Sequence, residues 1–196
     1  FLQGAAGAGG AGGLDITDVF STYLFTPNTS GNFPVTNNID LDGEGGLVWL
    51  KQRDVSANHL LYDTNRGASA GRLASNLDNG EALAGVYFDA FNSDGFTVKD
   101  MNADEMASWT FRKAPKFFDV VTWTGDGVSG RTISHSLNSE VGFYVVKRLD
   151  ASGDWRTYHR VSDSASNPNI AYLNGTSGGV FESDKLTATS TTFTIE

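Results

Sequence analysis

The fold is decided by the stretch at residues 45–54 (GGLVWLKQRD), which is followed by residues 59–63 (HLLYD). Short apolar runs of this length, bounded by glycine or polar residues, are typical of β-strands. The polar residues between the two runs provide a turn, so the second run folds back along the first. We therefore predict an antiparallel pair of strands here.

A second pair of runs resembles the first and lies about a hundred residues later, at residues 141–150 (VGFYVVKRLD) and 155–159 (WRTYH). Four identical pairs are each separated by 96 positions: Lys51 and Lys147, Asp54 and Asp150, Ser56 and Ser152, and Tyr62 and Tyr158. Further along, residues 96–98 (FTV) correspond to residues 193–195 (FTI) at a separation of 97. A nearly constant separation predicts an internal duplication.

This pattern predicts an all-β chain of two tandem antiparallel β-sandwiches, at residues 14–113 and 117–196, with about eight short strands in each. The alternative is one larger sandwich built jointly from both halves. Residues 4–13 contain only glycine and alanine, so we interpret residues 1–13 as a flexible or extended tether. Close-packed backbone in a multi-chain fibre is the alternative for this segment.

The second half lacks its last strand. The first half closes with residues 96–99 and then 108–112, whereas the second stops at residues 193–196. Such a gap leaves a row of unpaired N–H and C=O groups at a sheet edge. We expect it to be filled by residues beyond Glu196 or by an extended segment of a neighbouring subunit. Because the chain begins with Phe1, we also expect a processed product or part of a longer polypeptide.

Composition excludes several classes of partner. A net charge of −9 argues against nucleic acid and anionic membranes. The chain has no cysteine, which excludes disulfides and thiolate metal sites. No apolar run approaches about 18 residues, so we expect no membrane insertion. Aromatic residues make up 12% of the chain and glycines number 23, a mixture that favours strands and turns.

The histidines show no catalytic pattern. Ser134 and His135 are adjacent in a predicted strand, so their side chains point to opposite faces and cannot form a nucleophile–base pair. His59, His135 and His159 lie in different strand contexts, without the spacing of a metal site. We therefore expect surface or packed histidines, no enzyme and no cofactor.

Two acidic segments were candidates for chemistry. Asp40, Asp42 and Glu44 alternate, so they can share one side of an extended segment. We interpret them as a solvated acidic loop rather than the carboxylate pair that glycoside hydrolysis requires.

The other segment, residues 100–105 (DMNADE), begins like a calcium loop, with oxygen ligands at Asp100, Asn102 and Asp104. Glu105 stands where that loop needs glycine, and Phe111 where it needs a bidentate glutamate. We therefore predict a polar connection and no required metal.

Trp155 is the one aromatic residue that suggests a binding site. It takes the place of His59 in the repeat, follows a polar turn, and is flanked by Arg156 with His159 and Arg160 nearby. An aromatic ring with neighbouring cations can stack on a sugar or hold a protein partner. The alternative is a half-buried ring that packs against a neighbouring strand.

Several of these motifs together resemble an uncharacterised module of tailed-phage structural proteins of the marine phage type. The resemblance covers residues 18–196 and is carried by residues 45–51 (GGLVWLK), 61–67 (LYDTNRG), 91–97 (FNSDGFT), 109–114 (WTFRKA), 118–121 (FDVV), 130–135 (GRTISH) and 145–148 (VVKR). It implies a concanavalin-like or laminin-G-like jelly roll and no catalytic residues.

The resemblance also implies a virion protein of a tail, fibre or capsid-surface appendage, with other virion subunits as oligomeric partners. Its role would be assembly or attachment to the host surface. A carbohydrate-binding module that recognises host surface glycans is the alternative.

Overall fold

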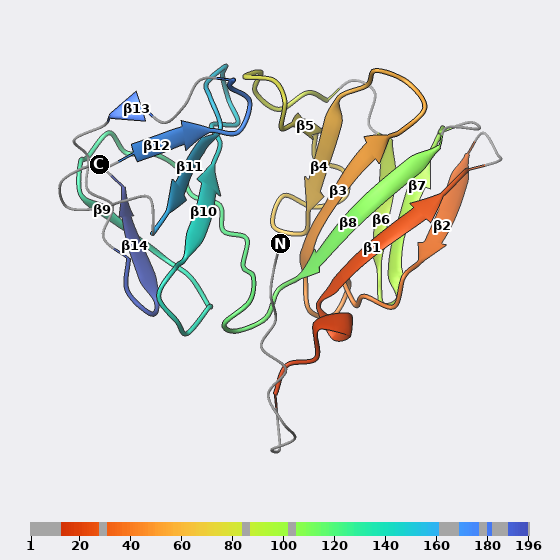
Figure 1. Cartoon of the computed structure of the whole chain (residues 1–196), viewed down its shortest axis with the longest axis horizontal. Coiled ribbons are helices and arrows are strands. Elements are labelled where there is room, and N and C mark those ends of the chain that lie inside the picture. The colour runs from red at the N-terminus through yellow and green to blue at the C-terminus, as the bar shows by residue number, and fades with distance from the viewer. Residues whose placement is uncertain are drawn as a thin grey trace.

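The chain forms two β-rich halves that lie side by side in a computed structural model (Figure 1). The structure describes residues 13–27, 31–83, 87–101, 105–160, 169–176, 180–181 and 188–195. In these residues every strand pair is antiparallel, and the one helix is a short 3-10 turn, η1 (Ile16–Asp18). The predicted all-β antiparallel class is confirmed.

The first half is a sandwich of two sheets, with strand orders β1-β8-β3-β4-β5 and β2-β7-β6. Its strands are β1 (Phe20–Phe25), β2 (Asn32–Thr36), β3 (Gly46–Gln52), β4 (His59–Asp63), β5 (Leu73–Ala74), β6 (Phe88–Asn92), β7 (Gly95–Lys99) and β8 (Met106–Arg112). The predicted pair at residues 45–63 is β3 with β4, and Val48 lies opposite Tyr62.

The core of this half follows from the alternation of its strands. Successive side chains of a strand point to opposite faces, so Val48 and Leu50 are fully buried between the sheets while Trp49 faces the other way. The buried cluster between the sheets consists of Phe25, Val35, Ile39, Leu41, Val48, Leu50, Tyr62, Phe88, Phe96, Val98, Met101 and Met106.

A hairpin at residues 92–95 joins β6 to β7, with Asn92 opposite Gly95. Gly95 is required by space as well as by the turn, because a Cβ there would run into the carbonyl oxygen of Val35 on β2. The backbone N–H groups of Asn37 and Asn38 then donate to the Asp94 carbonyl. The hairpin is therefore held at the end of its sheet.

The second half contains two further sheets, with strand orders β10-β11-β12-β13 and β14-β9. Its strands are β9 (Arg131–Ser134), β10 (Phe143–Val146), β11 (Arg156–His159), β12 (Asn169–Tyr172), β13 (Val180–Phe181) and β14 (Thr192–Ile195). Aromatic rings fill the space between the sheets: the Tyr144 ring stacks on Tyr158 at 4.9 Å and on Phe193 at 5.4 Å.

The strand pairs of the two halves share the same register. Val48 lies opposite Tyr62 in the first half, and Tyr144 lies opposite Tyr158 in the second. The same holds for the neighbouring pairs: Leu61 with Leu73 and Thr157 with Ala171, and Val35 with Phe96 and Ile133 with Phe193. The pairings of β10 with β11, β11 with β12 and β9 with β14 therefore follow those of β3 with β4, β4 with β5 and β2 with β7.

One segment that aligns in sequence with a strand of the first half is not a strand. Residues 118–124 align in sequence with β1, yet they contain no strand, and only Phe118 forms an isolated bridge, to Ala114. In the first half β1 pairs with β8 alone, and the described residues of the second half have no strand in the place of β8. A β-rich segment without a neighbour to accept its hydrogen bonds does not join a sheet. The second half therefore shows six strands in its described residues, against an expectation of about eight.

Candidate functional site

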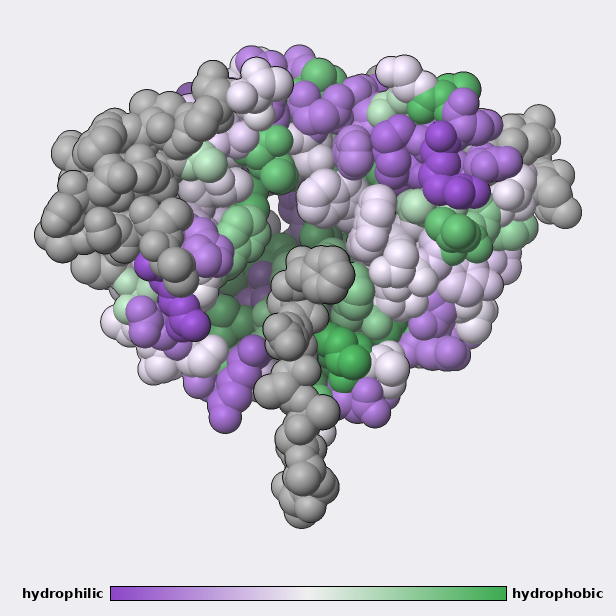
Figure 2. Space-filling view, viewed as in Figure 1, coloured by the Kyte–Doolittle hydropathy of each residue, from purple (hydrophilic) through white to green (hydrophobic). Residues whose placement is uncertain are grey.

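The two halves meet through the outer faces of corresponding sheets. The buried contact consists of Leu61, Leu73 and Trp155, against which Leu47, Trp49, Val145 and Leu149 are packed. Leu47, Trp49 and Leu61 lie on the face of the first sheet that points away from its own core. This contact surface is called the junction below. Figure 2 shows the viewed face of the molecule hollowed between the halves.

Trp155 is the central side chain of the junction. Only 5% of the residue is exposed. Its indole Nε1–H donates to the carbonyl oxygens of Ala74 at 3.0 Å and Leu77 at 2.9 Å, both in the first half. Its own backbone N–H donates to Asn174 Oδ1 at 2.9 Å. The ring is therefore fixed by hydrogen bonds at the same time as it fills an apolar contact.

Backbone groups extend the junction beyond Trp155. The Glu81 N–H donates to the Leu149 carbonyl at 2.7 Å, and the Gly153 N–H donates to the Asp78 carbonyl at 2.8 Å. Lys147 Nζ also donates to the Asp78 carbonyl, at 3.1 Å. Burial lowers the pKa of the Lys147 ammonium, which the negative charge of Asp78 partly offsets. The loop at residues 77–82 thus contacts the turn at 147–153 mainly through main-chain atoms.

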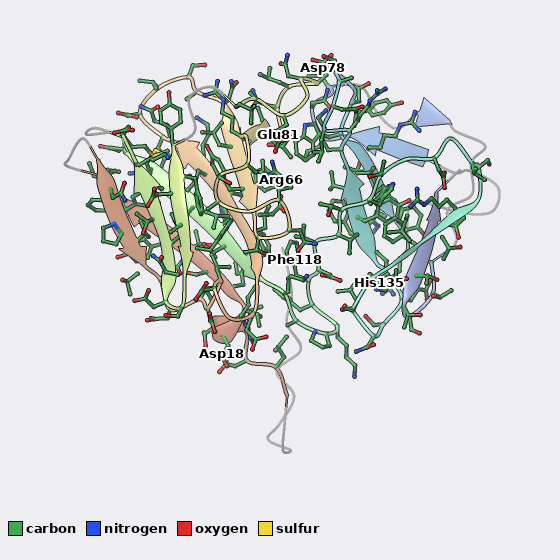
Figure 3. The ribbon with its side chains drawn as sticks, turned by 180° about the vertical axis from the view of Figure 1, so that it is seen from behind. Asp18, Arg66, Asp78, Glu81, Phe118 and His135 are labelled. Carbon is green, nitrogen blue, oxygen red and sulfur yellow. The ribbon has the colours of Figure 1, made fainter. Side chains whose placement is uncertain are left out.

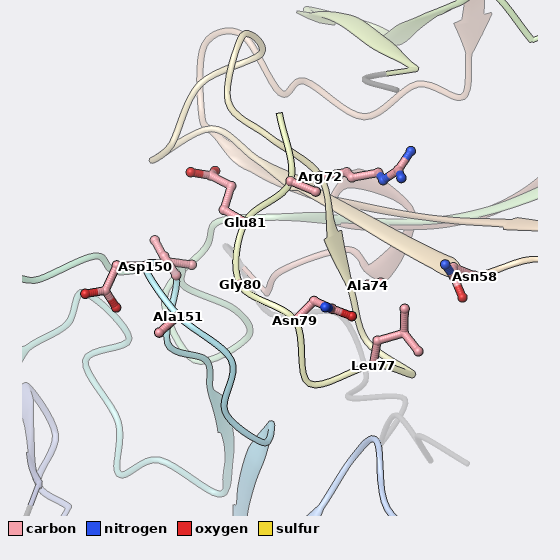
Figure 4. A pocket seen from close by; sticks show the side chains of 11 residues that line it. Asn58, Arg72, Ala74, Leu77, Asn79, Gly80, Glu81, Asp150 and Ala151 are labelled. Atoms are coloured by element: carbon pink, nitrogen blue, oxygen red, sulfur yellow. The ribbon is translucent and has the colours of Figure 1, made fainter. Parts of the chain in front are cut away.

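A pocket of about 520 Å³ opens beside this contact. Its polar lining is contributed by Asn58, Arg72, Asn79, Glu81 and Asp150, and both halves supply residues to it. Figure 4 shows Glu81 and Asp150 on one side of the pocket, and Arg72 and Asn58 on the other. The lining offers amide and charged groups for hydrogen bonding to a polar ligand.

A buried cation supports one wall of the pocket. Arg66 Nε donates to Asp63 Oδ2 at 2.6 Å, and its Nη1 donates to Glu81 Oε1 at 2.7 Å. The Arg66 and Asp63 side chains are each 7% exposed. The guanidinium also donates to the carbonyl oxygens of Gly71 and Leu61, so it has a partner on every side. Figure 3 shows Arg66 and Glu81 on the part of the first half that faces the second.

The four residues predicted for ligand binding do not form one site. The ring of Trp155 is buried in the junction and is not the exposed platform that sugar stacking needs. Arg156 and His159 are exposed on β11. Because successive residues of a strand point to opposite faces, these two residues, three positions apart, lie on opposite faces of the sheet. His159 lies against Phe143, with ring centroids 6.3 Å apart, and Arg160 donates its backbone N–H to the Gly142 carbonyl.

The three histidines lie on different elements, as the sequence predicted: His59 on β4, His135 directly after β9, and His159 at the end of β11. His59 accepts a hydrogen bond at Nδ1 from Trp49 Nε1 at 3.2 Å, on the outer face of the first sheet. Burial, and then the charge of Lys51, lower the pKa of the His59 imidazole. His135 is buried against Phe193 in the second half. Each ring is packed on an aromatic neighbour, and His59 lies T-shaped to Trp49.

The first acidic segment lies within the described residues, and the second does so in part. Glu44 forms an ion pair with Arg112 at 3.5 Å, and Asp40 accepts the backbone N–H of Gly43 within a tight turn. Asp100 directly follows β7, while Asn102 and Asp104 lie outside the described residues. In the part of the chain that the structure describes, no three histidine or acidic side chains gather in the geometry of a metal site.

Arg66, Asp78 and Glu81 were not predicted from the sequence as functional residues. Arg66 and Glu81 are separated by 15 positions, with the short strand β5 between them, and the hydrogen bonds of Asp78 at the junction are accepted by its carbonyl oxygen. None of these three residues belongs to a stretch of alternating apolar residues. The one available signal was residues 61–67 (LYDTNRG), where an aspartate and an arginine three positions apart follow a buried strand.

No helix among the described residues has the length and apolar character that crossing a membrane would require. A family model described as a domain of unknown function (DUF7483) matches residues 15–196. No curated protein and no solved structure matches the chain.

Proposed function

This chain belongs to the family described as a domain of unknown function (DUF7483), and we propose that it is a non-enzymatic structural module of a phage particle. In this proposal it forms part of a tail, fibre or capsid-surface appendage and serves assembly or attachment to the host. The sequence motifs that resemble phage structural proteins support the assignment of the chain to a phage particle. The architecture supports the structural role.

The observation that carries the structural role is the junction. Two sandwiches are joined by a buried tryptophan, by Trp155 hydrogen bonds to Ala74 and Leu77, and by main-chain bonds between Glu81 and Leu149 and between Gly153 and Asp78. Main-chain bonds fix relative orientation more tightly than contacts between flexible side chains. A body of two sandwiches with a fixed relative orientation is suited to hold neighbouring parts of an assembly at a set distance.

An internal duplication is part of this proposal. The shared register of the strand pairs supports it, and so does ring packing at corresponding positions. Phe25 and Phe96 lie T-shaped at 6.0 Å and 72° in the first half. Trp123 and Phe193, which correspond to them in sequence, lie T-shaped at 5.9 Å and 75°. A duplicated module builds length from one fold, which suits a fibre or an appendage.

Carbohydrate binding is the second candidate, and the polar pocket favours it. With Trp155 buried, the amide and charged groups of Asn58, Asn79 and Asp150 are what a glycan would meet. The acidic net charge of −9 directs this alternative toward neutral or basic sugars rather than anionic ones.

The structural role is tested on particles purified from a culture that produces this protein. We expect peptides of the chain to sediment with the particle through a density gradient, in a fixed ratio to the other particle proteins. Recovery of the chain only in the soluble fraction contradicts the proposal.

The alternative is tested on a glycan array with the whole chain and two variants. Asn58→Ala changes the pocket, and Asn65→Ala changes an exposed amide outside it. Glycan binding that Asn58→Ala abolishes and Asn65→Ala leaves intact supports a carbohydrate-binding module. An array without signal excludes the printed glycans as ligands.

A further inference from the structure

The chain contains two Asn-Gly pairs, Asn79-Gly80 in the first half and Asn174-Gly175 in the second. Asparagine before glycine undergoes a slow ring closure, in which the glycine nitrogen attacks the side-chain carbonyl carbon of the asparagine. Glycine permits this approach because it has no Cβ in the way. The closure needs a side-chain amide that is free to turn toward the main chain and a glycine N–H that is open to base. The two pairs differ in both respects.

The pair in the second half is held by three hydrogen bonds. Asn174 Oδ1 accepts the Trp155 N–H at 2.9 Å, and Asn174 Nδ2 donates to Asp154 Oδ1 at 2.8 Å. The Gly175 N–H donates to the Tyr172 carbonyl at 3.0 Å. Both ends of the side-chain amide are therefore fixed and the glycine nitrogen is engaged, so these bonds must break before the ring can close.

The pair in the first half has none of these restraints. Asn79 is exposed on the loop at residues 77–82, and its side-chain amide has no hydrogen bond within the described part of the chain. Nor does the Gly80 N–H donate to any residue that the structure describes. Figure 4 shows both residues at the wall of the pocket.

The junction itself requires glycine at position 80. A Cβ there would lie 2.7 Å from the Leu149 carbonyl oxygen, a backbone atom of the other half. Close contact between the halves therefore demands, directly after Asn79, the residue that makes an asparagine reactive.

We propose that Asn79 is a site of spontaneous deamidation and isomerisation, and that the isoaspartate formed there opens the junction. The Gly80 nitrogen gives up its proton to hydroxide and bonds to Asn79 Cγ. The Cγ–Nδ2 bond breaks, and the amide nitrogen takes up a proton and leaves as ammonia. Water then opens the resulting succinimide: addition at Cγ yields aspartate, and addition at the main-chain carbonyl carbon yields isoaspartate. Water is the only co-reactant, and no atom is oxidised or reduced.

Isoaspartate lengthens the main chain between two groups that are anchored on the other half. The Asp78 carbonyl accepts the Gly153 N–H at 2.8 Å, and the Glu81 N–H donates to the Leu149 carbonyl at 2.7 Å. Only two residues separate these groups, and in isoaspartate the main chain passes through the side chain and gains a carbon atom. The longer link moves one anchored group away from its partner. The new carboxylate is exposed, so its charge adds little.

The inference goes beyond the phage assignment. It rests on the hydrogen bonds of the two Asn-Gly pairs and on the main-chain contacts of the junction, so it stands whether or not the chain belongs to a particle.

The modification is measured by incubating the whole chain in mildly alkaline solution and mapping its peptides by mass spectrometry at intervals. We expect deamidation at Asn79 at least about tenfold faster than at Asn174, because the hydrogen bonds of Asn174 must first be broken. An isoaspartate-specific methyltransferase should label the peptide that contains residue 79. Equal rates at the two asparagines, or a faster reaction at Asn174, overturn the site.

Two variants separate the longer main chain from the new charge. Asn79→Gln keeps an amide, but its side chain would have to close a larger ring, so the variant should stay unmodified through the same incubation. Freshly purified Asn79→Asp carries the charge on a main chain of ordinary length. Because Asn79 is exposed, both variants are expected to fold normally.

Amide hydrogen exchange reports the state of the junction. In the incubated wild-type chain the N–H groups of Glu81 and Gly153 should lose protection in proportion to the isoaspartate content. The N–H groups of β3, which lies between β8 and β4, should keep theirs. Incubated Asn79→Gln and fresh Asn79→Asp should retain protection at both junction amides. Isoaspartate at residue 79 without loss of protection overturns the effect on the junction, and an equal loss in fresh Asn79→Asp overturns the role of the longer main chain.

Discussion

Trp155 in the second half donates its indole N–H to the carbonyl oxygen of Ala74 in the first half, over 3.0 Å. Trp155 corresponds in sequence to His59, which instead accepts a hydrogen bond from Trp49 within its own half. Corresponding positions therefore perform different tasks, one within a sheet and one between sheets. The junction depends on this difference, because two histidines in these places would leave the apolar contact unfilled.

Truncating Trp155 should loosen the junction. Trp155→Ala is expected to lower the free energy of unfolding by about 3–5 kcal/mol, since it removes a large buried side chain. Trp155→Phe keeps most of the ring and loses the donor to two buried carbonyls, a cost of about 1–3 kcal/mol. Urea denaturation measures both, with Val128→Ala as the exposed control. Loss of the junction should also split one transition into two, and a single unshifted transition in Trp155→Ala would contradict the role of the ring.

Gly80 should not accept a side chain. A Cβ at this position would lie 2.7 Å from the Leu149 carbonyl oxygen and 3.1 Å from the Ala151 nitrogen, both backbone atoms of the other half. Gly80→Ala is therefore expected to cost about 1–3 kcal/mol as the halves are forced apart. Gly125→Ala is the matched control, because no atom lies within 4 Å of its added Cβ. Equal melting temperatures of the two variants would count against close contact at Gly80.

The buried ion pairs of Arg66 should matter more than an exposed one. Arg66→Met leaves Asp63 and Glu81 without their cation, a change of the kind that costs about 3–5 kcal/mol. The control is Arg53→Ala, whose ion pair with Glu105 has side chains 44% and 55% exposed and contributes less than about 1 kcal/mol. Thermal denaturation compares the two. Similar losses of stability in both variants would show that the buried ion pairs of Arg66 contribute no more than an exposed one.

His59 should make stability depend on pH in one direction. Its pKa is lowered in the folded chain, so the unfolded chain takes up the proton first as the pH falls. The free energy of unfolding should decrease as the pH drops through the ordinary value of 6.5, and this contribution should level off below the lowered pKa. Protonation also removes the acceptor for Trp49 Nε1.

The control for this prediction is His59→Gln, which keeps an acceptor for Trp49 but does not titrate. Urea denaturation at about pH 7.5, 6.5 and 5.5 should give a smaller slope for the variant. Identical slopes would assign the pH dependence to other groups.

Strand pairs between neighbours in sequence can be predicted, because residues close in sequence determine that pairing. Alternating apolar residues in β3 and the Asp94-Gly95 turn between β6 and β7 fix pairing between neighbours in sequence. Residues 118–124, which align in sequence with β1, form no strand for the complementary reason. Their composition favours a strand, but pairing depends on a partner in the place of β8, which no local pattern reports.

The junction and the pocket could not be predicted from periodicity. Trp155 and Ala74 are separated by 81 positions, and Arg66 and Glu81 by 15. Such contacts depend on how two separately folded sheets dock. Trp155 is buried at the junction. Its position beside a turn did not indicate this from the sequence, because a tryptophan there is equally suited to an exposed platform and to a buried contact, and the surface that it meets decides between them.

The positions of the ends of β1 and β8 determine how the first half would unfold under a pulling force. Phe20 is the first residue of β1 and lies opposite Phe111, near the end of β8. The chain therefore enters β1 and leaves β8 at the same end of this strand pair. A pulling force between Leu14 and the second half would therefore act across this pair and open the ladder from Phe20 onward, one bond after another. The six other strands of the first half would bear almost none of that tension. A force transmitted through Trp155 and its neighbours would not load the β1–β8 pair. The strength of the junction therefore determines whether the hydrogen bonds of that pair break one after another or the two halves resist the force together.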